Sequence, residues 1–415
     1  MRLPSIRHSL ACLLAAGLMS AAQPAAAQSD TSEPPQQVSA KKKTGKKAKK
    51  AEPRGDPRAY AAYWQAVADK RRVRNAKRRD GQPVELTDYV LTQPPAYARL
   101  PRIARDPLEP GVPRIPSVAD FLKAATEKHK FVPQRPESDT EFKKSYARLA
   151  IAAGLTAEQA VRIYAFETGG NGTYDVQAGL TPPLRPKSRP ISPAVGYNQL
   201  LSTNSVSLLA EHGDRFLDVL RQKAVALDGD AKAAMEKKIE ATRRLVIFSR
   251  SVPYGWAVHD KLAKTTRAGM GVHAVLLDAD LGPLLQTQKL LDSIKLARSR
   301  GYMAPLTAVD LEMMNLTGDG NGYDLVTMPQ EWRDQVPTSN FFQPGGYHLN
   351  TIASRTKVVS VLFAAMEAKM NRASQQDGAR EMAAVFAEVA RELAGEKVEA
   401  KAEPKAEPAV SVEAQ

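Results

Sequence analysis

The 415-residue sequence contains one cysteine, few aromatic residues (6%) and no apolar run long enough to cross a membrane as a helix. These shortages argue against an integral membrane protein and against a disulfide framework. The sequence also lacks a Gly-x-Ser-x-Gly elbow, a Walker loop, a dinucleotide fingerprint and a His-Glu-x-x-His motif. We therefore do not expect the hydrolases, nucleotide-binding proteins or zinc peptidases that carry those motifs.

The first 27 residues have the pattern of a Sec-type signal peptide. Arg2 and Arg7 form a short basic start, residues 10–22 are apolar, and Ala25-Ala26-Ala27 provides the small residues after which signal peptidases cut. An uncleaved membrane-anchored helix is the alternative, but the apolar stretch is shorter than a membrane span. We expect a cleaved signal, a mature chain without Cys12, and a periplasmic or secreted protein.

The formal net charge of +14 is concentrated near the N-terminus. From Lys41 to Arg79 there are 16 Lys and Arg against three Asp and Glu, which leaves residues 80–415 almost neutral. Because this charge belongs to an exported tail and not to a domain face, we expect no nucleic-acid partner. Anionic envelope polymers are the expected partners of the tail, and a solvated disordered spacer is the alternative.

Composition and hydrophobic periodicity divide the chain into segments. We expect a mainly α fold with a small β-hairpin or loop region, preceded by a disordered basic N-terminal segment. The expected segments are a signal peptide at 1–27, a disordered Lys/Pro-rich linker at 28–58, a basic helix and Pro-rich extended segment at 59–137, a helical domain at 138–375 with a helical insertion at about 210–290, a C-terminal helix at 376–396 and a disordered tail at 397–415. Within them, the pattern predicts helices at Val206–Leu227, Asp230–Ser251, Trp256–Thr265, Leu281–Ser299, Thr307–Leu316, Ser354–Asn371 and Ala379–Leu393.

Glu167 lies at the carboxyl end of a predicted helix that begins with the Thr156 and Gln159 capping pattern and ends at Gly169-Gly170. Free backbone carbonyls make this helix end negative, and neighbouring aromatic residues partly withdraw the carboxyl group from water. Both effects raise a carboxyl pKa, as a general acid near neutral pH requires. A solvated surface glutamate is the alternative. The two glycines allow a sharp turn and a close approach of substrate to the backbone.

A second motif follows a Pro-rich loop and leads into a helix, and its residues are Ala194-Val195-Gly196-Tyr197-Asn198-Gln199-Leu200. A helix ending in Glu-Thr followed by this motif resembles the lysozyme superfamily, in particular the soluble lytic transglycosylases and goose-type lysozymes. The family wording is Glu-Ser and then Gly-Leu-Met-Gln-Leu, so Tyr197 and Asn198 replace the usual Leu and Met.

The resemblance covers about residues 156–209 and, more loosely, residues 291–326. In the second region Asn315-Leu316-Thr317-Gly318 resembles the Asn-Leu-x-x-Gly helix of the family. The chain departs from the family in the long segment 210–290 and in lacking an Ala-Tyr-Asn-Ala-Gly motif. Tyr302 or Tyr347 would supply the tyrosine that touches the catalytic Glu in that family.

The resemblance implies a lysozyme-like catalytic domain at 138–375 that cleaves the β-1,4 linkage between MurNAc and GlcNAc in peptidoglycan glycan strands without a cofactor. Glu167 takes the place of the catalytic acid, which protonates the bridging oxygen. In the transglycosylase variant the resulting carboxylate takes the proton of the muramic 6-hydroxyl, giving a 1,6-anhydro end. Thr168, Gly196 and Gln199 take the places of the family's Ser, Gly and Gln.

Five loop residues have both a substrate-binding and a structural interpretation. Asp175 would activate water in an inverting hydrolase, or it holds its own Gly-Asn loop. Asn198 and Gln199 would bond an acetamido group, or they satisfy buried loop backbone. Tyr174 and Tyr197 would stack on sugar faces, or they pack in the interior.

The histidines of the expected mature chain show no ligand spacing, so no metal site is expected. They are His129, His212, His259, His273 and His348. Gly170-Asn171-Gly172 and Gly320-Asn321-Gly322 echo each other, and we expect both to form turns. The second of them resembles part of a calcium loop but lacks the terminal Glu of that motif.

Two functions from different classes fit these patterns. The first is an exported peptidoglycan-cleaving enzyme, a lytic transglycosylase or lysozyme-type glycosidase, with Glu167 as general acid and base. The second is a non-catalytic envelope protein that keeps a lysozyme-like fold, binds glycan and holds anionic polymer with its basic tail.

Overall fold

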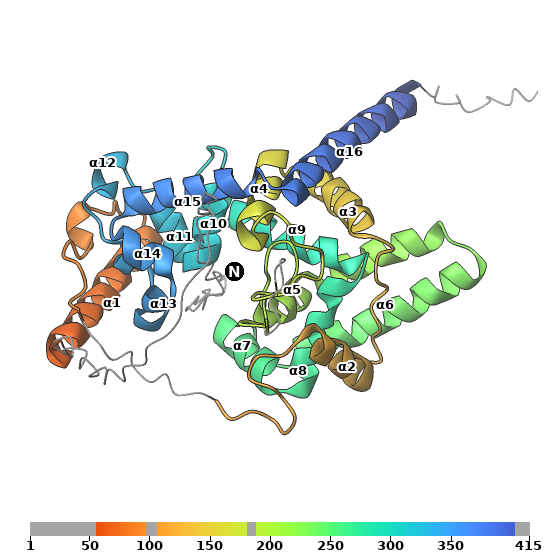
Figure 1. Ribbon diagram of the computed structural model, residues 1–415, viewed down its shortest axis with the longest axis horizontal. Helices are drawn as coiled ribbons and strands as arrows, with labels where there is room; N and C mark the ends of the chain where they lie inside the picture. Colours follow the sequence, from red (N-terminus) through yellow and green to blue (C-terminus); the bar gives the residue numbers. More distant parts are fainter. Residues whose placement is uncertain (1–54, 97–105, 181–187, 403–415) are drawn as a thin grey trace, which may run out of the picture.

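The computed structural model describes residues 55–96, 106–180 and 188–402 (Figure 1). The expected signal peptide, Cys12 and nearly all of the expected linker lie outside these residues, as does the end of the expected C-terminal tail. The α-helices are α1 (Pro57–Arg79), α2 (Val118–His129), α3 (Asp139–Ala152), α4 (Ala157–Thr168), α5 (Ser202–Val225), α6 (Gly229–Ser249), α7 (Trp256–Thr265), α8 (Arg267–Val272), α9 (Leu281–Ser299), α10 (Ala308–Thr317), α11 (Asp319–Val326), α12 (Gln330–Arg333), α13 (Pro344–Leu349), α14 (Thr351–Thr356), α15 (Val359–Ala373) and α16 (Asp377–Ala402). Three short 3₁₀ helices are η1 (Leu86–Asp88), η2 (His273–Leu277) and η3 (Thr338–Phe341).

The expectation of a mainly α fold is confirmed, and the described residues contain no named strand. The loop between α4 and α5 holds two isolated antiparallel bridges, Gln177 with Val195 and Val195 with Leu200. The described residues therefore hold a loop region here and no hairpin of named strands. No single described helix has the length and apolarity to cross a membrane; the segments 267–277 and 281–299 pass that test only as a pair, which is bent by 96°.

The helices pack around two hydrophobic cores. The first core is built by α1, α3, α4, η3, α10, α11 and α13–α16, and the second by α2, α5–α8 and η2. Helix α9 joins them, because Leu281, Leu284 and Leu285 at its start belong to the second core while Leu290 and Ala297 belong to the first. In Figure 1 the first core lies mostly on the left, the second on the right and α9 between them.

Helix α1 is part of the folded first core and not of a tail. Arg74 is fully buried, and its Nε donates to Asp324 Oδ2 on α11 at 2.7 Å. Arg78 also pairs with Asp324, and the Arg74 guanidinium lies 4.3 Å from the Tyr89 ring centroid. Part of the basic stretch 41–79 is therefore neutralised inside the molecule, and the basic tail ends before α1.

The expected segment 59–137 does not form a unit of its own, since α1 packs in the first core and α2 in the second. The expected insertion at about 210–290 supplies most of the second core. At the C-terminus α16 packs Met382, Phe386 and Val389 into the first core. It continues to Ala402, so the expected helix end at 396 is six residues too early.

The turn expected at Gly320-Asn321-Gly322 is wrong, because these residues lie in α11. Gly322 faces the Met314 backbone of α10 so closely that a Cβ atom there would clash with it. The glycine permits a close helix crossing, which a local turn signal does not reveal.

Candidate active site

Glu167 stands in the last turn of α4. Thr156 and Gln159 form the expected capping box at the start of this helix, with both reciprocal bonds present. At its end Gly169 adopts φ 71°, the left-handed conformation that stops a helix. The same cap that ends the helix leaves Glu167 beside carbonyls without intrahelical partners.

Helix α10 supplies the direct contacts of the Glu167 carboxyl group. Asn315 Nδ2 donates to Glu167 Oε1 at 3.2 Å. Glu312 lies one turn earlier on the same face of α10, and only 1% of it is exposed. Both oxygens of Glu312 are withdrawn from solvent, and the side chain lies within reach of Glu167 and Asn315. A proton on Glu312 supplies the donor that joins it to Glu167.

Burial raises the pKa of Glu167 to about 7, against the opposing effects of the Lys369 charge and of hydrogen bonds from Glu312 and Asn315. Burial and the nearby Glu167 charge raise the pKa of Glu312 well above its ordinary value. Near neutral pH the pair therefore holds one proton when Glu167 is ionised and two when Glu167 is protonated. The sequence-based expectation of a raised Glu167 pKa is confirmed, with burial as the main cause.

Lys369 on α15 supplies the positive charge of this cluster. Its Nζ lies 3.5 Å from the centroid of the Phe166 ring, a cation–π contact. Burial lowers the pKa of Lys369, while Glu167 and Glu312 act in the opposite direction. The cluster of Glu167, Glu312, Asn315 and Lys369 therefore combines two carboxyl groups, an amide donor and an ammonium group, contributed by α4, α10 and α15.

The residues after Glu167 serve the fold. Thr168 is buried, and its hydroxyl donates to the Tyr164 carbonyl at 2.7 Å. Gly170 has φ 83°, and a Cβ atom there would clash with the Ala373 carbonyl at the end of α15. The close approach that we expected for substrate is thus made by the protein's own backbone.

The second motif packs against α3, α4 and α9. Tyr197 is fully buried, and its hydroxyl donates to Asp139 Oδ1 at 2.9 Å. Its ring meets that of Tyr164 at 5.0 Å between centroids. Gly196 adopts φ 86°, and a Cβ atom would come within 3.1 Å of Gln286 Nε2. This motif therefore reaches α4 three residues before Glu167.

The two amides of the motif are engaged within the protein. The Asn198 backbone N–H donates to Gln286 Oε1 at 3.0 Å, and Asn198 Nδ2 donates to the Gln286 carbonyl at 3.1 Å. Gln199 adopts φ 43° and donates to the carbonyls of Val176 and Gly196 at 3.1 and 2.8 Å. Both amides therefore satisfy groups within the protein, as expected if these residues serve the loop and not a sugar.

Tyr174 and Asp175 share one partner, Arg135. Arg135 donates to the Tyr174 hydroxyl at 2.6 Å and to Asp175 Oδ2 at 2.5 Å, while Thr173 donates to Asp175 Oδ1 at 2.7 Å. The Tyr174 ring stacks on Phe142. Asp175 is one-third exposed and holds its loop by these bonds.

Among the described residues, neither Tyr302 nor Tyr347 donates a hydrogen bond to Glu167; Tyr347 packs instead against Trp64, Phe342 and His348. Surface hollows of about 420 and 350 Å³ lie at α5–α6 and at α4–α15–α16, and Glu167 lines neither. The sequence did not assign Glu312, Asn315 or Lys369 to the site. Of these, only Asn315 carried a signal, through the Asn-Leu-x-x-Gly pattern.

No family model, curated protein or solved structure matches the chain.

Proposed function

We propose that the protein is an exported peptidoglycan-cleaving enzyme in which Glu167 is the general acid and then the general base. The observation that carries this proposal is the cluster around Glu167, where the carboxyl group of this half-buried residue has a pKa near 7 and is held by Asn315 beside the buried Glu312. A carboxyl group in this condition is protonated often enough at neutral pH to donate to a glycosidic oxygen.

Each partner in the cluster has a distinct role in this mechanism. Glu312 keeps its proton and donates to Glu167, which limits how far burial raises the Glu167 pKa. Asn315 holds Oε1 by its hydrogen bond and so fixes the orientation of the Glu167 carboxyl group. Lys369 stabilises the carboxylate that Glu167 becomes after the transfer. The Glu167–Glu312 pair therefore holds two protons before the transfer to the leaving sugar and one proton after it.

The substrate class rests on the resemblance to lytic transglycosylases and goose-type lysozymes. Glu167 and the Gly196 to Gln199 motif carry that resemblance, and Tyr164 and Tyr197 join the two in space. Asp175 is tied to Arg135 and Thr173, which favours a transglycosylase that uses Glu167 alone over an inverting hydrolase with Asp175 as base.

A zymogram of purified cell-wall sacculi tests this proposal. Wild type is expected to clear the gel, Glu167→Gln to leave it intact, and Asp175→Asn to retain clearing. Glu158→Gln is a matched control, because Glu158 lies on the same helix and pairs with Arg162 at the surface. Clearing by Glu167→Gln as strong as that by wild type would reject the role of Glu167.

A glycan-binding protein without catalysis is the second candidate. The observation that favours it is the internal bonding of Asn198 and Gln199, which leaves their amides on backbone and on Gln286. Absence of clearing by wild type, together with pelleting of wild type on sacculi, would support this function over the enzyme.

The tail is proposed to hold anionic envelope polymer. Because α1 belongs to the first core, a deletion that tests the tail must stop at residue 54. Removal of residues 29–54 takes away eight Lys and Arg, from Lys41 to Arg54, and leaves the described fold intact. Weaker pelleting at low salt, with the difference disappearing at high salt, is the expected result. Equal pelleting at low salt would reject this role.

A further inference from the structure

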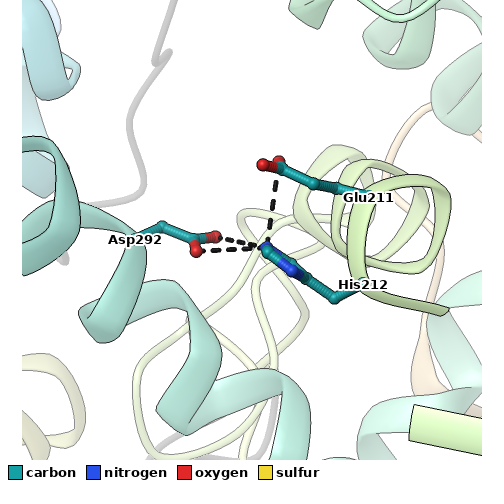
Figure 2. Close-up of side chains that lie close together, drawn as sticks. All are labelled: Glu211, His212 and Asp292. Carbon is teal, nitrogen blue, oxygen red and sulfur yellow. Dashed lines mark hydrogen bonds and ion pairs between the residues drawn. The ribbon is translucent and has the colours of Figure 1, made fainter. Parts of the chain in front are cut away.

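His212 differs from the other histidines in what its ring contacts. Among the five histidines that the structure describes, the other four bond to hydroxyl groups or backbone carbonyls. His212 on α5 instead faces two carboxylates, those of Glu211 on the same helix and Asp292 on α9. Figure 2 shows both carboxylates directed at one ring nitrogen, Nε2.

We propose that Glu211, His212 and Asp292 bind a divalent metal ion of the zinc class. His212 Nε2 lies 3.1 Å from either oxygen of Asp292 and 3.8 Å from Glu211 Oε2. One ligand atom from each residue lies within 4.8 Å of the other two. Ligands bonded to zinc at about 2.0–2.2 Å in tetrahedral geometry stand about 3.4 Å apart, and the observed separations lie on either side of that value.

The chemistry of the three donors selects the ion. An imidazole nitrogen suits zinc and its neighbours among the transition metals and is uncommon for calcium or magnesium. The two carboxylates supply two negative charges, which match the charge of a divalent cation. Three protein ligands leave the fourth tetrahedral position open for water.

Neighbouring side chains orient the carboxylates. Tyr254 donates its hydroxyl to Glu211 Oε2 at 2.6 Å, and Gln288 Nε2 donates to Asp292 Oδ1 at 2.6 Å. Hydrogen bonds of this kind fix metal-ligating carboxylates in proteins. The Glu211 side chain is 45% exposed and that of His212 14%, so an ion can enter from solvent while the imidazole stays in place.

The three residues are brought together by packing of α5 against α9. Glu211 and His212 are consecutive, and Asp292 follows 80 residues after His212. No ligand spacing in the sequence could show this site, which explains why we expected no metal from the scattered histidines. The proposal is independent of Glu167, because in the described part of the chain the three residues form their hydrogen bonds and ion pairs with one another, with Tyr254 and with Gln288.

Equilibrium dialysis of the mature protein against Zn²⁺, followed by elemental analysis and calorimetric titration, tests the proposal. Chelator-treated wild type is expected to bind one equivalent of Zn²⁺ and to gain thermal stability. His212→Gln and Asp292→Asn are expected to weaken binding at least about tenfold. Co²⁺ in the same site should give the absorption bands of a tetrahedral complex in wild type alone.

Control variants separate a specific site from adventitious binding. Asp218→Asn removes an exposed carboxylate of α5, and His348→Gln removes a histidine that bonds to Tyr60; both should bind Zn²⁺ as wild type does. Glu211→Gln changes the most exposed ligand, so it serves where another variant fails to fold. Absence of saturable Zn²⁺ binding, or equal binding by wild type and all three ligand variants, would overturn the proposal and leave a histidine–carboxylate ion pair.

Discussion

Asn315 Nδ2 lies 3.2 Å from Glu167 Oε1, and this bond joins residues 148 positions apart in the sequence. It connects the last turn of α4 to α10, where Glu312 is buried on the same face. The bond orients the carboxyl group that we propose as acid and base. It also opposes the rise in the Glu167 pKa that burial causes.

Replacement of Asn315 by Ala should raise the Glu167 pKa further above 7. A hydrogen bond to the carboxylate favours the charged form, and its loss favours the protonated form. The alkaline limb of the pH–activity profile should therefore move upward, and activity at neutral pH should fall roughly tenfold as orientation is lost. Asn371→Ala, an exposed asparagine that bonds to Arg162, is the matched control. A profile with an unmoved alkaline limb would contradict the role of Asn315.

Glu312 makes stability depend on pH. Its pKa is raised in the folded protein, so the folded state binds more protons than the unfolded state once the pH exceeds the ordinary Glu value. The stabilisation that the Glu312 proton gives the folded protein is fully present at low pH and is lost as the pH rises through the pKa of Glu312 in the folded protein. Each such proton changes the unfolding free energy by up to about 1.4 kcal/mol per pH unit.

Glu312→Gln should accordingly flatten the decline of the unfolding free energy between pH 5 and pH 8. The glutamine amide still donates to Glu167 but has no charge to desolvate. Urea unfolding of wild type, Glu312→Gln and the exposed control Glu331→Gln at several pH values measures the effect. Parallel curves for all three proteins would show that Glu312 is not protonated in the folded state.

Gly170→Ala should destabilise the protein more than Gly154→Ala. The two glycines have nearly the same backbone angle, φ 83° and 82°, so the conformational cost of a side chain is similar at both. A Cβ atom at Gly154 meets open space, whereas at Gly170 it clashes with the Ala373 carbonyl. The difference in unfolding free energy should exceed about 1 kcal/mol, as overpacking typically costs. Equal losses of unfolding free energy in the two variants would mean that the backbone between α15 and α16 moves to make room for the added methyl group.

Asp324→Asn should be strongly destabilising, by about 3–5 kcal/mol, because it leaves Arg74 buried without its charged partner. Asp69→Asn breaks an exposed ion pair with Arg72 on the same helix α1 and should change stability by less than about 1 kcal/mol. Chemical denaturation of both variants measures the contrast. Similar small losses for both would indicate that α1 does not depend on its buried arginines.

Local signals predicted much of the helical fold and the position of Glu167. The capping pattern at Thr156 and the stop at Gly169 act within a few residues, and the structure contains both. Helices α7 and α9 also have the expected bounds. The spacing of apolar residues along each helix follows from the helical period, so it can be read directly from the sequence.

Contacts between distant helices were not predictable in this way. Glu312 and Lys369 join Glu167 only because α10 and α15 pack against α4, and the α11 helix forms where a Gly-Asn-Gly pattern indicated a turn. Gln286 of α9 binds Asn198, so an amide that the motif suggested for sugar is held internally. Such pairings depend on packing, which a period or a spacing along the chain does not specify.

The release of soluble muropeptides from purified sacculi, quantified by liquid chromatography and mass spectrometry, tests the role of Glu167 most directly. Wild type should release disaccharide peptides with new 1,6-anhydro ends, and Glu167→Gln should release at least a thousandfold less while remaining folded. A folded Glu167→Gln protein that releases the same products at a similar rate would contradict the account.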